Sequence, residues 1–177
     1  MEVLLGLDGN ILLWIQEYIR NDFLTPFFVF ITKLGDVGMI WIVLTLILMC
    51  NKKTRKTGVI SAVALLLSLL FCNVLLKNLV QRVRPYEVID TLTILVERQK
   101  DFSFPSGHTS ASFAAGIVFF RNLPKKFGVP AVILACLISF SRLYIGVHYP
   151  TDVICSIVFG VVLAFLSEQL CRKILRR

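Results

Sequence analysis

The residues best suited to chemistry lie in three short polar stretches separated by long apolar segments. One stretch, residues 141–152, contains Arg142, His148 and Asp152. His148 and Asp152 are four residues apart, so the carboxylate could accept a hydrogen bond from one ring nitrogen. Such a bond would fix the imidazole tautomer and leave the other nitrogen free to attack, as in a catalytic triad. The alternative is a His–Asp pair that only caps a helix.

The other two stretches supply groups that bind anions. Lys77 and Arg84 are seven residues apart, close to two helical turns, so both side chains can lie on one face and clamp a phosphate. The alternative is a pair of interfacial cations that reach toward water. Ser106 is well placed to cap a helix that begins near Gly107, and backbone amides at a helix start bind phosphate oxygens. His108 would then lie beside the bound anion.

Together the three stretches offer three cations, a helix N-terminus and two histidines. A histidine nucleophile in phosphoryl transfer needs such a set. We expect His148 to attack phosphorus and His108 to protonate the leaving oxygen, after which water hydrolyses the phosphohistidine. No carboxylate cluster suited to magnesium or calcium accompanies these residues in the sequence, so we expect no metal and no other cofactor.

The composition is that of an integral membrane protein. Apolar residues make up 56% of the chain and charged residues 17%, whereas soluble domains carry about 25% charged residues. The net charge of +8 comes from basic clusters between apolar runs. Short basic loops of this kind mark the cytoplasmic side of a membrane, and we expect no nucleic-acid partner. The basic clusters are residues 52–56, 121–126 and 172–177, and the five cysteines show no metal-ligand spacing.

The first part of the chain predicts helices at the membrane surface. Apolar residues repeat at helical spacing within residues 1–23, which indicates an amphipathic interfacial helix with Asn10 as a plausible N-cap. Residues 24–50 allow either one broken span or a short interfacial helix followed by a span that starts near Asp36. We favour the second, because Lys33 and Asp36 would otherwise lie in hydrocarbon.

The remaining apolar segments predict a helical bundle. All elements read as helices, so we expect an all-α polytopic membrane bundle of about five transmembrane helices plus the interfacial helix. The bundle would cover residues 24–172, within a single domain of residues 1–177. If the basic clusters are cytoplasmic, the three polar stretches emerge on the other face. This predicts a multi-pass protein of the cell membrane with an extracytoplasmic active site. The predicted later spans are residues 57–76, 107–120, 127–141 and 152–170.

The three stretches also resemble a known signature. They read Lys77-x6-Arg84-Pro85, Pro105-Ser106-Gly107-His108 and Ser141-Arg142-x5-His148-x3-Asp152. This pattern is similar to the three-part motif of the type 2 phosphatidic acid phosphatase superfamily, which shares its site with vanadium haloperoxidases and bacterial acid phosphatases. The resemblance covers residues 25–172, and all three motifs fit without a substitution.

The resemblance implies a role for each motif residue. His108 would be the general acid, His148 the nucleophile and Asp152 its partner. The phosphate-binding residues would be Lys77, Arg84, Ser106, Gly107 and Arg142.

Within the superfamily the chain resembles small bacterial enzymes that act on a lipid phosphate in the bilayer. These include undecaprenyl diphosphate phosphatases, phosphatidylglycerophosphate phosphatases and phosphatidic acid phosphatases. Many of the undecaprenyl diphosphate phosphatases carry Asp at the position of Gly107. The glycine in this chain therefore does not identify which of these lipids is the substrate. Our leading hypothesis is hydrolysis of undecaprenyl diphosphate to undecaprenyl phosphate. The alternatives are the other two lipid phosphatases, a lipid-to-lipid phosphotransferase, or a lipid-binding or transport subunit without catalysis. The sequence makes no prediction of oligomeric state.

Overall fold

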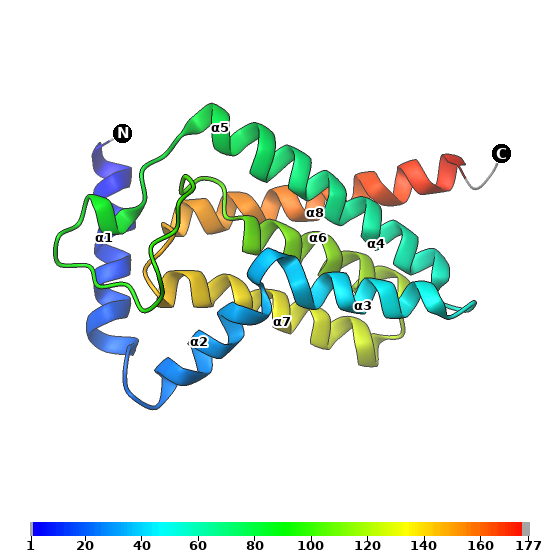
Figure 1. The fold of residues 1–177 in the computed structure, drawn as a ribbon, viewed down its shortest axis with the longest axis horizontal. Coiled ribbons are helices and arrows are strands. Elements are labelled where there is room, and N and C mark those ends of the chain that lie inside the picture. The colour runs from blue at the N-terminus through cyan, green and yellow to red at the C-terminus, as the bar shows by residue number, and fades with distance from the viewer. Residues whose placement is uncertain (1, 175–177) are drawn as a thin grey trace.

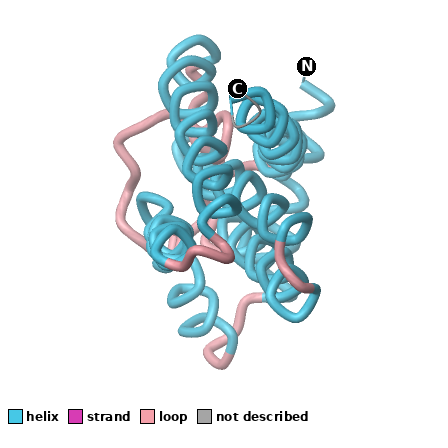
Figure 2. Tube along the Cα trace, turned by 90° about the vertical axis from the view of Figure 1, so that its right-hand side faces the viewer, coloured by secondary structure: helices cyan, strands magenta, loops and turns pink. Residues whose placement is uncertain are grey.

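The protein is a bundle of helices joined by loops (Figures 1 and 2). The structure is a computed structural model that describes residues 2–174, so Arg176 and Arg177 of the third basic cluster lie outside the described residues. No strand occurs within this range, which confirms the predicted all-α class. The α-helices are α1 (Glu2–Trp14), α2 (Leu24–Leu34), α3 (Met39–Cys50), α4 (Arg55–Ser68), α5 (Lys77–Val80), α6 (Gly107–Asn122), α7 (Lys125–Tyr144) and α8 (Pro150–Ile174). Two segments are π-helical, η1 (Ile15–Ile19) and η3 (Leu69–Leu76), and two are single 3₁₀ turns, η2 (Asp36–Gly38) and η4 (Pro85–Glu87).

Helix α6 forms the centre of the bundle and packs against α4, α7 and α8 (Figure 1). Many of its buried residues are Ala, Ser, Thr or Gly, which let neighbouring helices approach closely. Buried hydroxyl groups add hydrogen bonds between helices. The indole Nε1 of Trp41 donates to Ser112 Oγ over 2.8 Å, and the hydroxyls of Ser68 and Ser110 lie 2.9 Å apart. Helix α6 therefore provides a rigid base for the site at its N-terminus.

The outer faces of the bundle are apolar and exposed, as expected for helices in contact with lipid. Within residues 2–174, three helical segments are long and apolar enough to cross a membrane: Arg55–Glu87, Lys125–Tyr144 and Pro150–Lys173. The pair α2–α3, bent by 49°, counts as a fourth if it forms one span. Helix α6 has 16 residues, fewer than the roughly 20 of a full span. The predicted bundle is therefore present, although only three or four of its helices have the length of a span.

The chain breaks between α2 and α3 near Asp36, as both interpretations of residues 24–50 expect. The bent pair is compatible with one broken span, and α3 alone has 12 residues. Val37 has φ 53° and Gly38 has φ 70°, both in the left-handed region. A β-branched residue in this region costs about 1–3 kcal/mol. The turn directs the chain from α2 into α3 and places Asp36 at the polar end of the bundle.

Helix α1 runs across one end of the bundle (Figure 1) and is not among the candidate spans. Asp8, Leu12 and Ile15 are buried and spaced by four and three residues, which defines its inward face. The predicted N-cap at Asn10 was wrong, because α1 already begins at Glu2. The helical repeat of buried residues extends back to Asp8, a charged residue that the apolar pattern leaves out.

Candidate active site

The three polar stretches of the sequence meet at one cavity. Its volume is about 400 Å³, and it lies where α5 and α6 begin and α7 ends. Its lining includes the cations Lys77, Arg84 and Arg142 together with His108 and His148. All five candidate side chains thus face one space, although they are up to 71 positions apart (148 − 77) in the sequence.

Two of the cations are held by elements on either side of a turn. Lys77 begins α5 and is 7% exposed, whereas Arg84 is extended (φ −74°, ψ 150°) just before Pro85 and is 4% exposed. Arg84 also donates from Nη1 to the carbonyl oxygen of Val147 over 2.8 Å. The loop that carries His148 is therefore tied directly to the cation.

A carboxylate of the protein, Asp101, pairs with both of these cations. Asp101 Oδ2 accepts a hydrogen bond from Lys77 Nζ, and Asp101 Oδ1 lies 2.5 Å from Arg84 Nη2. Partial burial raises the pKa of Asp101, but the hydrogen bond and charge of Lys77 and the charge of Arg84 outweigh burial and lower this pKa to about 2. The clamp thus already binds a pair of anionic oxygens.

The third cation retains donors for a ligand. Arg142 is 2% exposed and donates from Nη1 to Thr32 Oγ1 over 2.7 Å. Its Nε is buried and has no hydrogen-bond partner among the residues that the structure describes. A buried guanidinium is stabilised most by a full set of acceptors, and Arg142 lines the cavity.

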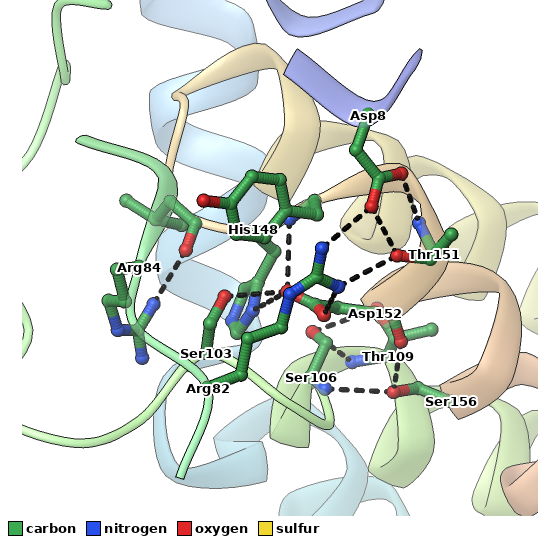
Figure 3. Close-up of polar contacts among 12 residues, drawn as sticks. Asp8, Arg82, Arg84, Ser103, Ser106, Thr109, His148, Thr151, Asp152 and Ser156 are labelled. Atoms are coloured by element: carbon green, nitrogen blue, oxygen red, sulfur yellow. Dashed lines mark hydrogen bonds and ion pairs between the residues drawn. The ribbon is translucent and has the colours of Figure 1, made fainter. Parts of the chain in front are cut away.

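The start of α6 is fixed by Ser106, which is its N-cap as the sequence predicts. The side chain of Ser106 accepts hydrogen bonds from the amide and hydroxyl of Thr109, over 3.5 and 3.1 Å, and its own amide donates to Ser156 Oγ over 2.8 Å (Figure 3). Gly107 lines the cavity, whereas Ser106 is not among the lining residues. A Cβ at Gly107 would overlap the side chain of Asn73. The absence of a side chain thus lets η3 approach the helix start.

His108 contacts both a carboxylate and a guanidinium at the cavity wall. Its Nε2 lies 2.9 Å from Asp36 Oδ1 and 3.3 Å from Arg142 Nη1. With a proton on Nε2, His108 donates to Asp36; without that proton, it accepts from Arg142. The position is suited to a group that gives up and regains a proton.

His148 and Asp152 are brought together, with Nδ1 of the ring 3.6 Å from Asp152 Oδ2. This separation is just beyond a hydrogen bond. Burial lowers the pKa of His148 to about 3, and the charges of Arg84 and Arg142 act in the same direction, against the opposing effect of Asp152. The imidazole is therefore neutral at pH 7. Because Nδ1 faces Asp152, Nε2 is the ring nitrogen that is not directed at the carboxylate.

Several residues of this region were not identified from the sequence. Asp36 and Asp101 contact the predicted site residues directly, and Ser103 donates to Asp152 Oδ2 over 2.5 Å. Arg82 and Asp8 extend the network behind Asp152 (Figure 3). Among these residues, only Arg82 could have been suspected from the sequence, because it lies two residues before the motif residue Arg84. Its partners Asp152 and Asp8 are about 70 positions away in the chain, so the spacing of residues does not predict the contacts.

The cavity continues into an apolar groove between α3 and α4. The groove is lined by Ile42 of α3 and by Leu65, Leu66 and Leu69 of α4 and η3. Leu66 and Leu69 are also exposed on the outer face of the bundle. A ligand with an anionic head and a hydrocarbon tail matches this combination of cations and apolar wall.

Comparison with known proteins assigns the family. Residues 57–175 match the PAP2 superfamily. The chain is 32% identical over 142 residues to an undecaprenyl-diphosphatase of Sulfolobus acidocaldarius, covering 80% of this chain and 68% of that protein. It is 35% identical over 148 residues to the undecaprenyl-diphosphatase BcrC of Bacillus subtilis, covering 83% of this chain and 75% of that protein.

A solved structure agrees in fold. The crystal structure of a transmembrane PAP2-type phosphatidylglycerolphosphate phosphatase from Bacillus subtilis superimposes with a TM-score of 0.79 and 28% identity, covering 98% of this chain and 89% of that one. The family match covers more than half of the chain and includes all three polar motifs. The chain therefore belongs to the PAP2 superfamily.

Proposed function

We propose that the protein is a membrane lipid phosphatase that works through a phosphohistidine intermediate. The observation that carries this proposal is the single cavity, in which three buried cations and two histidines adjoin an apolar groove. The cations match a phosphate group and the groove matches a lipid tail. Similarity to two undecaprenyl-diphosphatases supports the same class of reaction.

In the proposed first step, Nε2 of His148 attacks the terminal phosphorus of the lipid diphosphate. The bond from that phosphorus to the bridging oxygen breaks, and the bridging oxygen leaves with the lipid phosphate. Burial lowers the pKa of His108 to about 4, so the negative charge of the bound substrate, together with Asp36, must hold the ring protonated. His108 then gives its proton to that leaving oxygen. Lys77, Arg84 and Arg142 neutralise the charge on the remaining phosphate oxygens. Asp101 must leave the clamp before the phosphate binds, because the carboxylate and the phosphate use the same donors.

In the second step, water attacks the phosphohistidine and inorganic phosphate leaves. His108, now neutral, accepts the proton from that water. The bond from phosphorus to His148 breaks, so the imidazole returns to its neutral state. Asp152 stabilises the positive charge that His148 carries while it is phosphorylated.

The proposed substrate is undecaprenyl diphosphate, which would yield undecaprenyl phosphate. The named relatives support this choice. The similarity to the phosphatidylglycerolphosphate phosphatase supports a second candidate, phosphatidylglycerophosphate. The presence of Gly107 in place of Asp is compatible with either lipid.

The proposed location of the active site is the extracytoplasmic face of a cell membrane. In support, the basic residues of the 52–56 and 121–126 clusters lie at the ends of α3 and α6 that are distant from the cavity. Arg172 and Lys173 lie in the last turn of α8, at the same end. A basic end of a bundle favours the cytoplasm.

The test is phosphate release by the purified, detergent-solubilised protein from undecaprenyl diphosphate, phosphatidylglycerophosphate and phosphatidic acid. We expect inorganic phosphate as product and the highest kcat/KM for undecaprenyl diphosphate. Lys77→Gln should lose this activity, whereas Lys125→Gln, at the opposite end of the bundle, should retain it. Transfer of phosphate to an acceptor lipid without release would support a phosphotransferase, and inactivity on all three lipids would refute the proposal.

A further inference from the structure

Arg82 connects the catalytic region to the N-terminal helix. Its Nη1 lies 2.6 Å from Asp152 Oδ1, and its Nη2 lies 2.7 Å from Asp8 Oδ2 on α1 (Figure 3). The guanidinium stacks over the ring of Tyr149, 3.9 Å from its centroid. Nη1 also donates to Thr151 Oγ1 over 2.7 Å. The planar group is therefore held on two edges and one face.

Asp152 depends on Arg82 for its charge balance. The Asp152 carboxylate is fully buried, and within residues 2–174 only Arg82 and His148 lie at ion-pair distance from it. While His148 is neutral, Arg82 supplies the only formal positive charge in contact. A buried carboxylate without such a partner would take up a proton instead.

Arg82 also determines the direction in which Asp152 points. Oδ1 is taken by Arg82, whereas Oδ2 accepts from Ser103 Oγ over 2.5 Å and from the amide of Tyr149 over 3.0 Å. These contacts leave Oδ2 as the oxygen that faces Nδ1 of His148. Rotation of the carboxylate would break at least one of them.

Asp8 sets the net charge of this network. It is 3% exposed, and its Oδ1 accepts from the amide of Thr151 over 3.1 Å. Arg82 and Asp152 alone would be neutral together, and Asp8 gives the trio a net charge of −1. His148 becomes positive when its Nε2 is phosphorylated. A net negative trio beside Nδ1 therefore stabilises the phosphorylated state more than a neutral pair would.

Resting on the phosphatase proposal, we propose that Arg82 and Asp8 are positioning residues, which hold the buried Asp152 carboxylate ionised and aimed at the nucleophilic histidine. Helix α1 thus takes part in catalysis through Asp8, in addition to lying across the end of the bundle. Neither side chain lines the cavity, so neither contacts the phosphate.

The proposal predicts a change in kcat with little change in substrate binding. Arg82→Gln and Asp8→Asn should lower kcat by roughly 10- to 100-fold, the range for a small misplacement of reacting groups. The KM and the inhibition constant for inorganic phosphate should stay within about twofold, because the clamp cations are untouched. Arg82→Lys, which keeps the charge but not the planar fork, should recover part of the lost kcat.

The matched control is Arg98→Gln. Arg98 also pairs with a carboxylate, Glu87 at 2.9 Å, and lies over a tyrosine ring, but its side chain is 69% exposed. This variant should keep the kcat of the unmodified protein. The double variant Asp8→Asn/Arg82→Gln should lose little more kcat than Arg82→Gln alone, because Asp8 acts through Arg82.

The results separate this inference from the proposed function. No phosphate release by the unmodified protein would refute the function itself. If the unmodified protein is active, an unchanged kcat in folded Asp8→Asn would overturn the positioning role, as would equal losses in kcat and phosphate affinity. Asp8→Asn preserves side-chain volume, and the experiment therefore remains decisive even if Arg82→Gln does not fold.

Discussion

Asp101 Oδ1 lies 2.5 Å from Nη2 of Arg84, so a side chain of the protein occupies the clamp that we propose for the phosphate. The side chain of Asp101 is 52% exposed and belongs to the loop before α6, so it can move away without unpacking the bundle. Binding of a phosphate is therefore an exchange of one anion for another.

Asp101→Asn should strengthen phosphate binding. The amide competes for the clamp less well than the carboxylate, and we expect the inhibition constant for inorganic phosphate to fall roughly fivefold, about 1 kcal/mol for a half-exposed ion pair. The pKa of Asp101 is about 2, so the carboxylate stays ionised and the ratio of the two constants should be constant from pH 5 to 8. The inhibition constant is measured by adding inorganic phosphate to the lipid hydrolysis assay. Equal inhibition constants for Asp101→Asn and the unmodified protein would show that Asp101 does not compete with phosphate.

Leu69→Trp should weaken the binding of long-chain lipids more than that of short-chain lipids. Leu69 lines the groove, and a larger ring there should raise the KM for a long-chain lipid phosphate roughly tenfold, about 1.4 kcal/mol. A short-chain analogue that does not reach the groove should be hydrolysed normally. Leu70→Trp is the control, because Leu70 is similarly exposed on the same turn but does not line the groove. Equal effects on both lipids would contradict the assignment of the groove.

Gly107→Ala should impair the helix start that faces the phosphate. The added methyl overlaps the end of the Asn73 side chain, so this side chain must turn away or the start of α6 must shift. A shift near 1 Å should lower kcat/KM on the order of 10- to 100-fold. Shortening Asn73 removes the overlap, so Gly107→Ala/Asn73→Ala should be more active than Gly107→Ala alone. The Asn73→Ala variant is the reference, and no recovery in the double variant would rule out the steric explanation.

His148 should make the protein less stable as the pH falls below 6.5. Its folded pKa is lowered to about 3 from an ordinary 6.5, mainly by burial, so between these values the unfolded chain binds a proton that the folded protein does not. Stability is therefore retained above pH 6.5 and lost on acidification, by about 1.4 kcal/mol per pH unit at most.

The measurement is thermal unfolding in detergent from pH 4.5 to 6.5, above the range where Asp101 titrates. His148→Asn should show a smaller fall of Tm over this interval than the unmodified protein. Arg98→Gln, which leaves His148 in place, should follow the unmodified protein. A His148→Asn curve parallel to the unmodified one would contradict the buried, neutral histidine.

The class of fold and the site region followed from local sequence features. Long apolar runs predict membrane helices. Lys77, His108 and His148 lie where these runs end, which predicted that they share one end of the bundle. Ser106 was predicted as an N-cap because that signal depends only on neighbouring residues. The break near Asp36 was likewise visible from charges inside an apolar run.

The supporting contacts could not be predicted in this way. Asp101 lies in an irregular loop without periodicity, and Asp8 contacts Arg82, 74 positions along the chain. Asp8 interrupts an apolar pattern, so its burial follows only from the helix that it packs against. Such pairings depend on the three-dimensional arrangement of segments, which the spacing within one segment does not contain.

The most direct test of the central claim is phosphate release by His148→Ala. The variant should be assayed beside the unmodified protein in detergent, with undecaprenyl diphosphate and phosphatidylglycerophosphate as substrates. Loss of the nucleophile should reduce the rate by more than about 10³-fold, while the Arg98→Gln control remains active. A His148→Ala protein that releases phosphate at the unmodified rate would contradict the phosphohistidine mechanism.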